Sequence, residues 1–125
     1  MSTIYDIRTK TGGEDSNATD AKIFITLHGE NNIDSDEIEL DTPGKDDFMR
    51  GAIDTFKISV PQDNFGPIRA ITMRNDNSGP QPGWWLVWVK VSNNGHTGEF
   101  PLDNWIAEDE ENGLTVVINR NGAWA

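Results

Sequence analysis

The chain has 125 residues, and its 21 acidic and 10 basic side chains give a formal net charge of −11. This length fits one domain with one hydrophobic core, and the absence of cysteine excludes disulfides and cysteine-bound zinc. The acidic balance argues against nucleic acid as a partner, because phosphate binding needs a basic surface. No apolar run approaches the roughly 20 residues of a transmembrane helix.

Short alternating segments separated by turn residues run along the whole chain. Eight segments have the pattern of β-strands: 4–9, 21–27, 37–40, 55–60, 67–73, 84–91, 96–102 and 114–118. Asn94-Gly95 is the dipeptide preferred in a type I′ hairpin turn. Because no segment has a helical period, we expect an all-β fold, an antiparallel β-sandwich formed by one domain over residues 1–125.

Two of these segments carry more specific expectations. In 67–73, apolar residues fall on both faces, which predicts a central strand. In 84–91, strict alternation predicts that Leu86 and Trp88 share one face and that Val87 and Val89 share the other.

An acidic connection separates the third and fourth predicted strands. Between Glu30 and Arg50 there are eight acids and two bases, a net charge of −6. A Pro43-Gly44 turn there is surrounded by Asp41, Asp46 and Asp47. Carboxylates crowded at a turn require either full solvation or a bound cation, and both interpretations remain open from the residues alone.

The stretch after this turn carries a recognisable pattern. Its letters are LDTPGKDDFMRGAIDTFKI, with Phe48, Gly51, Asp54 and Phe56 at regular spacing. This pattern resembles the central signature of the PLAT (lipoxygenase-homology) domain, and the flanking residues agree with that family over nearly the whole chain. The resemblance implies a sandwich of two four-stranded sheets.

The resemblance also implies a calcium site, because many PLAT domains bind Ca²⁺ with an acidic turn and a neighbouring strand. The residues that match those ligands are Thr19, Asp20, Asp41, Thr42, Gly44 and Asp46. The turn is one residue longer than the family pattern, which leaves Asp46 and Asp47 as alternatives for the last ligand. A second calcium cluster would pair the 13–18 loop with Asp76.

The sequence offers little for catalysis. It lacks a G-x-S-x-G nucleophile motif and an H-E-x-x-H metal motif. His28 and His96 have no partnering nucleophile, and we expect both on the surface. These observations predict a protein that is not an enzyme.

Core packing is the default role for each of the five tryptophans. The resemblance implies core positions for Trp105 and for one of Trp84 and Trp85. Trp88 falls where the family usually has a polar residue, so we expect it on a surface that contacts lipid or a partner. Trp84 and Phe48 are further candidates for that surface, although the family pattern favours the core for Phe48.

Together these features predict a stand-alone, non-catalytic targeting module that associates with lipid membranes in a calcium-dependent way. The alternative is a protein-interaction module whose calcium is structural, and a carbohydrate-binding sandwich is a third possibility. Without a signal peptide in these residues, we expect a cytoplasmic or peripheral membrane location. The lipid or protein partner and the oligomeric state stay open.

Overall fold

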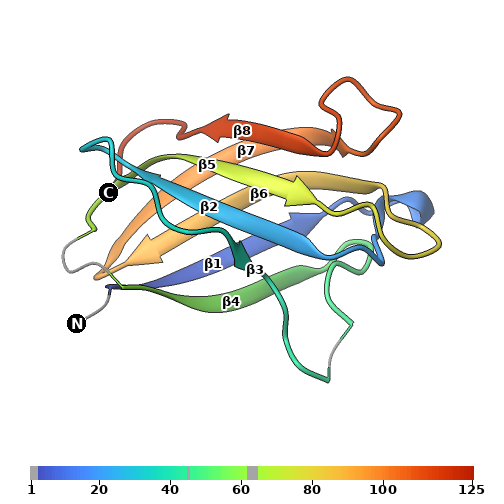
Figure 1. The fold of residues 1–125 in the computed structure, drawn as a ribbon, viewed down its shortest axis with the longest axis horizontal. Helices are drawn as coiled ribbons and strands as arrows, with labels where there is room; N and C mark the ends of the chain where they lie inside the picture. The colour runs from blue at the N-terminus through green and yellow to red at the C-terminus, as the bar shows by residue number, and fades with distance from the viewer. Residues whose placement is uncertain (1–2, 45, 62–64) are drawn as a thin grey trace.

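The protein forms two four-stranded antiparallel sheets that pack face to face, as seen in a computed structural model that describes residues 3–44, 46–61 and 65–125 (Figure 1). The first sheet has the order β4 (Ile53–Val60), β1 (Thr3–Thr11), β6 (Trp84–Asn93) and β7 (His96–Ile106). The second has the order β3 (Ile38–Glu39), β2 (Ile23–Gly29), β5 (Ile68–Asn75) and β8 (Thr115–Asn119). The predicted all-β sandwich of two four-stranded sheets is therefore confirmed.

Alternating side chains build the core between the two sheets. Strand β4 alternates strictly between exposed and buried residues along its whole length, and β2 alternates between buried and half-buried ones. The largest fully buried side chains include Phe65, which precedes β5, and residues of both sheets: Trp84, Tyr5, Phe100, Ile7, Ile23, Ile25 and Leu27. The half-buried and exposed positions of each strand form the two outer faces.

The expected alternation of β6 is wrong, because the strand contains a bulge. Leu86 pairs with Thr11 of β1, whereas Trp88 pairs with the adjacent Lys10, so the register shifts between them. The extra residue, Val87, reverses the parity of the strand. As a result Val89 joins Leu86 in the core, while Val87 and Trp88 both remain partly exposed.

Two other expectations are confirmed. Strand β5 is central, between β2 and β8, and a register shift opposite His28 and Gly29 lets the neighbours Ala70 and Ile71 both be buried. Asn94 and Gly95 have φ values of 56° and 83°, as a type I′ turn requires.

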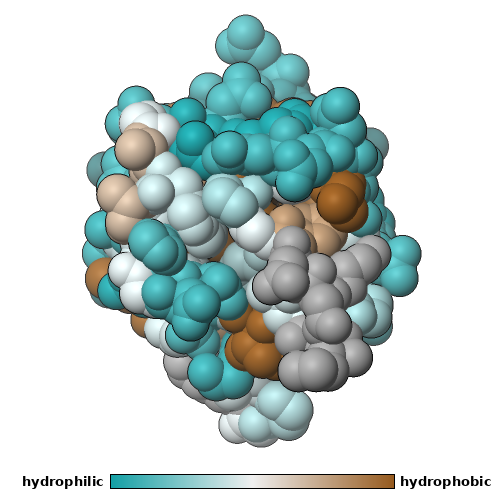
Figure 2. All heavy atoms as spheres, turned by 90° about the vertical axis from the view of Figure 1, so that its left-hand side faces the viewer, coloured by the Kyte–Doolittle hydropathy of each residue, from teal (hydrophilic) through white to brown (hydrophobic). Residues whose placement is uncertain are grey.

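Four loops gather at one end of the sandwich, on the right in Figure 1: 12–22, 40–52, 76–83 and 107–114. Their described residues include eleven acidic side chains and only two basic ones. We call this end the acidic end. Figure 2 shows the opposite end, where the coloured surface is mainly hydrophilic with small, separate apolar areas. The excess of negative charge among the described residues is therefore concentrated at the acidic end.

Candidate functional site

The acidic end contains a pocket of about 610 Å³ between the loops 12–22 and 40–52. We call it the carboxylate pocket. It brings together four of the predicted calcium ligands, which are Thr19, Asp20, Asp41 and Asp46. Glu39 and Asp47 also line it, whereas Thr42, Gly44 and Asp76 are not among its lining residues. Thr19 and Asp46, which are 27 positions apart in sequence, thus line the same pocket.

Asp47 has an incompletely bonded carboxylate in this pocket. Its Oδ2 accepts a hydrogen bond of 2.7 Å from the Thr42 backbone N–H. Its Oδ1 is buried and has no hydrogen-bond partner within the described part of the chain. A buried carboxylate oxygen without a donor is costly, and a bound cation is one group that would satisfy it.

The other carboxylates of the pocket do not converge on one point. Within residues 3–44, 46–61 and 65–125, no group of three or more His, Cys, Asp or Glu side chains lies close enough to hold a metal ion. Asp20, Asp41 and Asp46 are exposed to solvent. The pocket therefore offers oxygen donors of the kind that Ca²⁺ prefers, without a preformed ring of ligands.

Thr19 and Asp76 order the loops around the pocket. The Thr19 hydroxyl donates to the Pro82 carbonyl at 2.6 Å, and Asp76 Oδ1 accepts hydrogen bonds from Ser78 and from the Lys22 backbone N–H. Burial alone would raise the pKa of Asp76, but these hydrogen bonds and the charge of Lys22 outweigh it, so its pKa is lowered. Asp76 is therefore held as a carboxylate, and its role as a metal ligand stays a prediction.

The expectation that Phe48 lies on a binding surface is wrong. Phe48 is 4% exposed and packs against Phe56 and Trp84, with ring centroids 5.6 and 4.9 Å away. Its backbone has a φ of 64°, unusual for an aromatic residue, and its N–H donates to buried Asp54 Oδ2 at 2.9 Å. This turn sends the next residue outward, so Met49 lies at the rim of the pocket and is 53% exposed.

The tryptophans also differ from expectation. Trp84 is fully buried, with its Nε1 donating to Thr11 Oγ1 at 2.9 Å, so its expected surface position is wrong, whereas the core position expected for one of Trp84 and Trp85 is confirmed. Trp105 was expected in the core, yet it lies partly exposed beside Trp85 on the outer face of the first sheet. Trp88 is partly exposed on the same face, and the Lys90 ammonium lies 4.6 Å from the centre of its ring.

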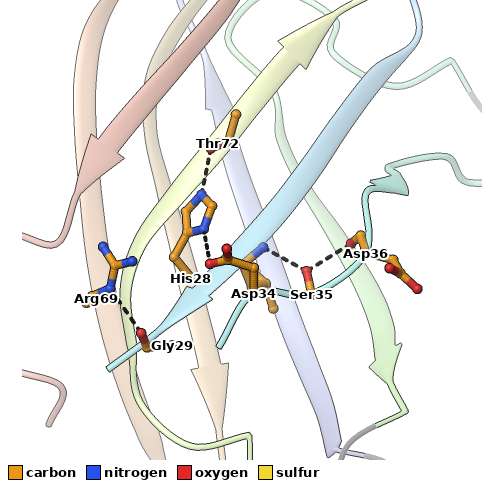
Figure 3. Close-up of polar contacts among 8 residues, drawn as sticks. His28, Gly29, Asp34, Ser35, Asp36, Arg69 and Thr72 are labelled. Carbon is orange, nitrogen blue, oxygen red and sulfur yellow. Dashed lines mark hydrogen bonds and ion pairs between the residues drawn. The ribbon is translucent and has the colours of Figure 1, made fainter. Parts of the chain in front are cut away.

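A hydroxyl, an imidazole and a carboxylate form a chain on the second sheet (Figure 3). His28 Nδ1 lies 2.6 Å from Asp34 Oδ1, and its Nε2 lies 2.6 Å from Thr72 Oγ1. His28 is therefore only 18% exposed, rather than the surface residue we expected. Thr72 lies in the middle of β5, paired with Thr26 and Val117.

The role of this chain of polar groups follows from its neighbours. Ser35 accepts the Leu27 backbone N–H and donates to the Asp36 carbonyl, and the Arg69 side chain donates to the Gly29 carbonyl (Figure 3). For Thr72, His28 and Asp34 to act as a catalytic triad, free hydrogen-bond donors beside the Thr72 hydroxyl would have to stabilise an oxyanion. Thr72 lies in a strand between two others, and such a strand uses its backbone N–H groups in the sheet. These contacts hold the 30–37 loop against β2 and β5.

The structure contains no membrane-spanning helix among the residues it describes.

Comparison with known proteins agrees with this architecture. A sequence profile of the PLAT/LH2 domain matches residues 5–119. The chain is 31% identical to mouse lipoxygenase homology domain-containing protein 1 over 118 residues, which are 92% of this chain and 6% of that protein. It is 33% identical to human polycystin-1-like protein 1, covering 88% of this chain and 4% of that protein. The chain thus spans less than a tenth of these relatives.

Solved structures have the same fold. Coral 8R-lipoxygenase, described as calcium-activated through a C2-like domain, matches with a TM-score of 0.82 at 24% identity, over 96% of this chain and 17% of that one. Clostridium perfringens alpha-toxin matches with a TM-score of 0.75 at 21% identity, over 96% of this chain and 31% of the toxin. The sandwich, its strand order and the profile match lead to one conclusion: this chain belongs to the PLAT/LH2 domain family.

Proposed function

We propose that this domain attaches to lipid membranes through its acidic end, and that calcium bound in the carboxylate pocket is required for attachment. The observation that carries the proposal is Asp47 Oδ1, a buried carboxylate oxygen without a hydrogen-bond partner among the described residues. Asp47 lines a pocket together with four further acidic side chains. Calcium activation is stated for coral 8R-lipoxygenase and calcium dependence for an 11R-lipoxygenase, both with the same fold.

The donor set of the pocket suits calcium. Asp20, Asp41, Asp46 and Asp47 would supply carboxylate oxygens, and backbone carbonyls of the 40–48 turn are within the same loop. When bound, calcium contributes positive charge that offsets the repulsion among these carboxylates and attracts anionic head groups. Lys22, the one basic residue among the described residues that line the pocket, offsets part of that repulsion.

The apolar contact to the membrane would come from Met49. It is 53% exposed at the rim of the carboxylate pocket, next to the anchored Phe48. An unbranched apolar side chain beside a bound cation suits shallow insertion at the lipid interface. Trp88 lies on the outer face of the first sheet, and we expect it to contribute only if that face tilts toward the lipid.

Co-sedimentation with vesicles containing phosphatidylserine tests the proposal. The protein should bind in calcium and dissociate in chelator. Asp47→Ala should abolish binding, and Met49→Ala should weaken it severalfold, since one interfacial side chain contributes about a kcal/mol or two. Val117→Ala is the matched control for an exposed apolar residue, at 60% exposure on the second sheet, and it should bind normally.

Two outcomes would contradict this function. Calcium-independent binding would remove the metal from the mechanism. Calcium binding, measured by calorimetry, without attachment to vesicles of any composition would favour the alternative of a protein-interaction module with structural calcium. Trp88→Ala should leave binding nearly unchanged if the acidic end is the contact surface.

A further inference from the structure

A second pocket, on the outer face of the first sheet, is built from irregular backbone. The β6 bulge at Val87 turns this side chain outward, and the register with β7 skips from Asn104 to Pro101 at the same point. Asp103, inside this skip, has a φ of 52°. Backbone in this region is uncommon for residues other than glycine and often marks a functional position.

Two tryptophans form one wall of this pocket, whose volume is about 450 Å³. The rings of Trp85 and Trp105 meet edge to face, with centroids 5.5 Å apart and planes at 84°. Trp85 Nε1 donates to Asp103 Oδ1 at 3.1 Å, which fixes the indole. We call this the tryptophan pocket.

The 12–17 segment also lines this pocket, and Gly12 lies so close to the Trp85 indole that only a glycine fits there. A Cβ on Gly12 would lie 2.7 Å from Trp85 Cδ1 and 2.3 Å from Asn17 Oδ1. Asn17 is 6% exposed, and its Oδ1 accepts the Glu14 backbone N–H at 3.0 Å. This segment is therefore held in place before any ligand arrives.

The chemistry of the lining selects a cation. Among the described residues that line it, the two ionisable side chains, Glu14 and Asp103, are both acidic, and the other lining residues include two tryptophans and Val87. A cation gains from the indole face and from the carboxylates, and an aliphatic stem gains from Val87. A neutral sugar would gain nothing from the strongly acidic field of this end.

We propose that the tryptophan pocket binds a basic side chain, arginine or lysine, from a protein partner. The indoles offer a face on which a planar guanidinium can stack, and Asp103 offers a carboxylate with which it can pair. This inference goes beyond the membrane role and needs no calcium. It therefore gives the domain a second contact surface, separate from the carboxylate pocket.

NMR titration in chelator tests it, because the five tryptophan indole N–H signals report on separate places. The probe is N-acetyl-arginine methylamide, and its control is the uncharged analogue N-acetyl-citrulline methylamide. The signals of Trp85 and Trp105 should shift with the arginine probe only, while that of buried Trp84 stays unchanged. Shifts of equal size with citrulline would overturn recognition of charge.

Substitution of Asp103 locates the site. Asp103→Asn keeps an oxygen for Trp85 Nε1 and a side chain tolerant of positive φ, so the fold should persist. The variant should bind the arginine probe about threefold to tenfold more weakly. Asp109→Asn, an equal change of charge on a residue that does not line the pocket, should bind as the parent does. Equal weakening by both substitutions would overturn the site.

Phosphocholine, free and in vesicles, is the last arm of the experiment. A shift of the Trp85 and Trp105 signals by phosphocholine, with none by the arginine probe, would assign the pocket to a lipid head group and overturn a protein partner. Since all measurements are made without calcium, failure of the membrane proposal leaves this result unaffected, and the reverse also holds.

Discussion

One loop, residues 12–22, lines two pockets that differ in chemistry and in whether their polar groups are fully hydrogen-bonded. Its first half faces Trp85 in the tryptophan pocket, and its second half, from Thr19, faces Asp47 in the carboxylate pocket. In the first, Asn17 caps the short 3₁₀ turn. In the second, Asp47 Oδ1 is buried without a donor from the described residues.

The difference shows which pocket depends on a ligand. A wall whose polar groups are already bonded needs nothing further to be stable. A pocket with an unsatisfied carboxylate and a backbone outlier at Phe48 gains stability when a cation arrives. We therefore expect ligand-dependent stability at the carboxylate pocket and ligand-independent rigidity at the tryptophan pocket.

The largest expected effect comes from removing the support that both pockets share. Trp84 packs against Phe48 behind the carboxylate pocket and precedes Trp85 of the tryptophan pocket. Trp84→Ala should destabilise the fold by about 3–5 kcal/mol, as for other large buried aromatics. Urea unfolding measures this cost. Trp85→Ala should cost clearly less because this side chain is partly exposed, and equal costs would contradict the burial that separates the two.

Calcium should stabilise the carboxylate pocket alone. At a hundredfold excess over Kd, a ligand of the folded state adds about 2.7 kcal/mol, which corresponds to a rise of several degrees in Tm. Thermal unfolding with calcium and with chelator measures the difference. Asp47→Ala should lose the rise and Asp109→Ala should keep it. Superimposable curves for the parent protein in both conditions would refute the metal site.

Two adjacent glycines test the rigidity of the tryptophan pocket. Gly12→Ala should cost about 1–3 kcal/mol, because its Cβ would overlap Asn17 and the Trp85 ring. Gly13→Ala should change stability by no more than about 0.5 kcal/mol, because a Cβ there meets nothing within 4 Å. Denaturant unfolding of both variants gives the comparison. A tolerated Gly12→Ala would mean that this wall adapts easily.

The smallest effect tests a charge pair that lies in neither pocket. The Arg74 hydrogen bonds lower the pKa of Glu37 below its ordinary value of 4.5. Because the folded-state pKa is lowered, the stabilisation is fully present above about pH 4.5 and is lost as the pH falls through the lowered value. The side chains are 38% and 39% exposed, so solvent screening limits the gain to below about 1 kcal/mol.

Glu37→Gln should therefore lower the free energy of unfolding slightly at pH 7, and this difference should diminish as the pH falls below about 4.5. A difference that stays constant as the pH is lowered would show that packing, such as the contact of Arg74 with the Phe24 ring, causes the effect rather than charge.

Local patterns in the sequence were sufficient for much of the fold. The alternation of β4 and the Asn94-Gly95 turn each reflect the geometry of a few consecutive residues. The same holds for Gly51, which has the positive φ of 71° that only glycine adopts easily. Strand locations, the central position of β5 and the acidic turn could be predicted for this reason.

The sequence by itself determined the sandwich and the acidic turn at Asp41, Asp46 and Asp47, because periodicity and local charge are properties of neighbouring residues, whereas the gathering of four loops into the acidic end is tertiary. Only the tertiary structure decided that Trp105 faces outward and that Asp47 has an orphaned oxygen. Such features depend on partners distant in sequence, and the bulge at Val87 is likewise defined by its pairing with β1. A single extra residue in a pairing reverses which side chains face the core, and no local pattern records it.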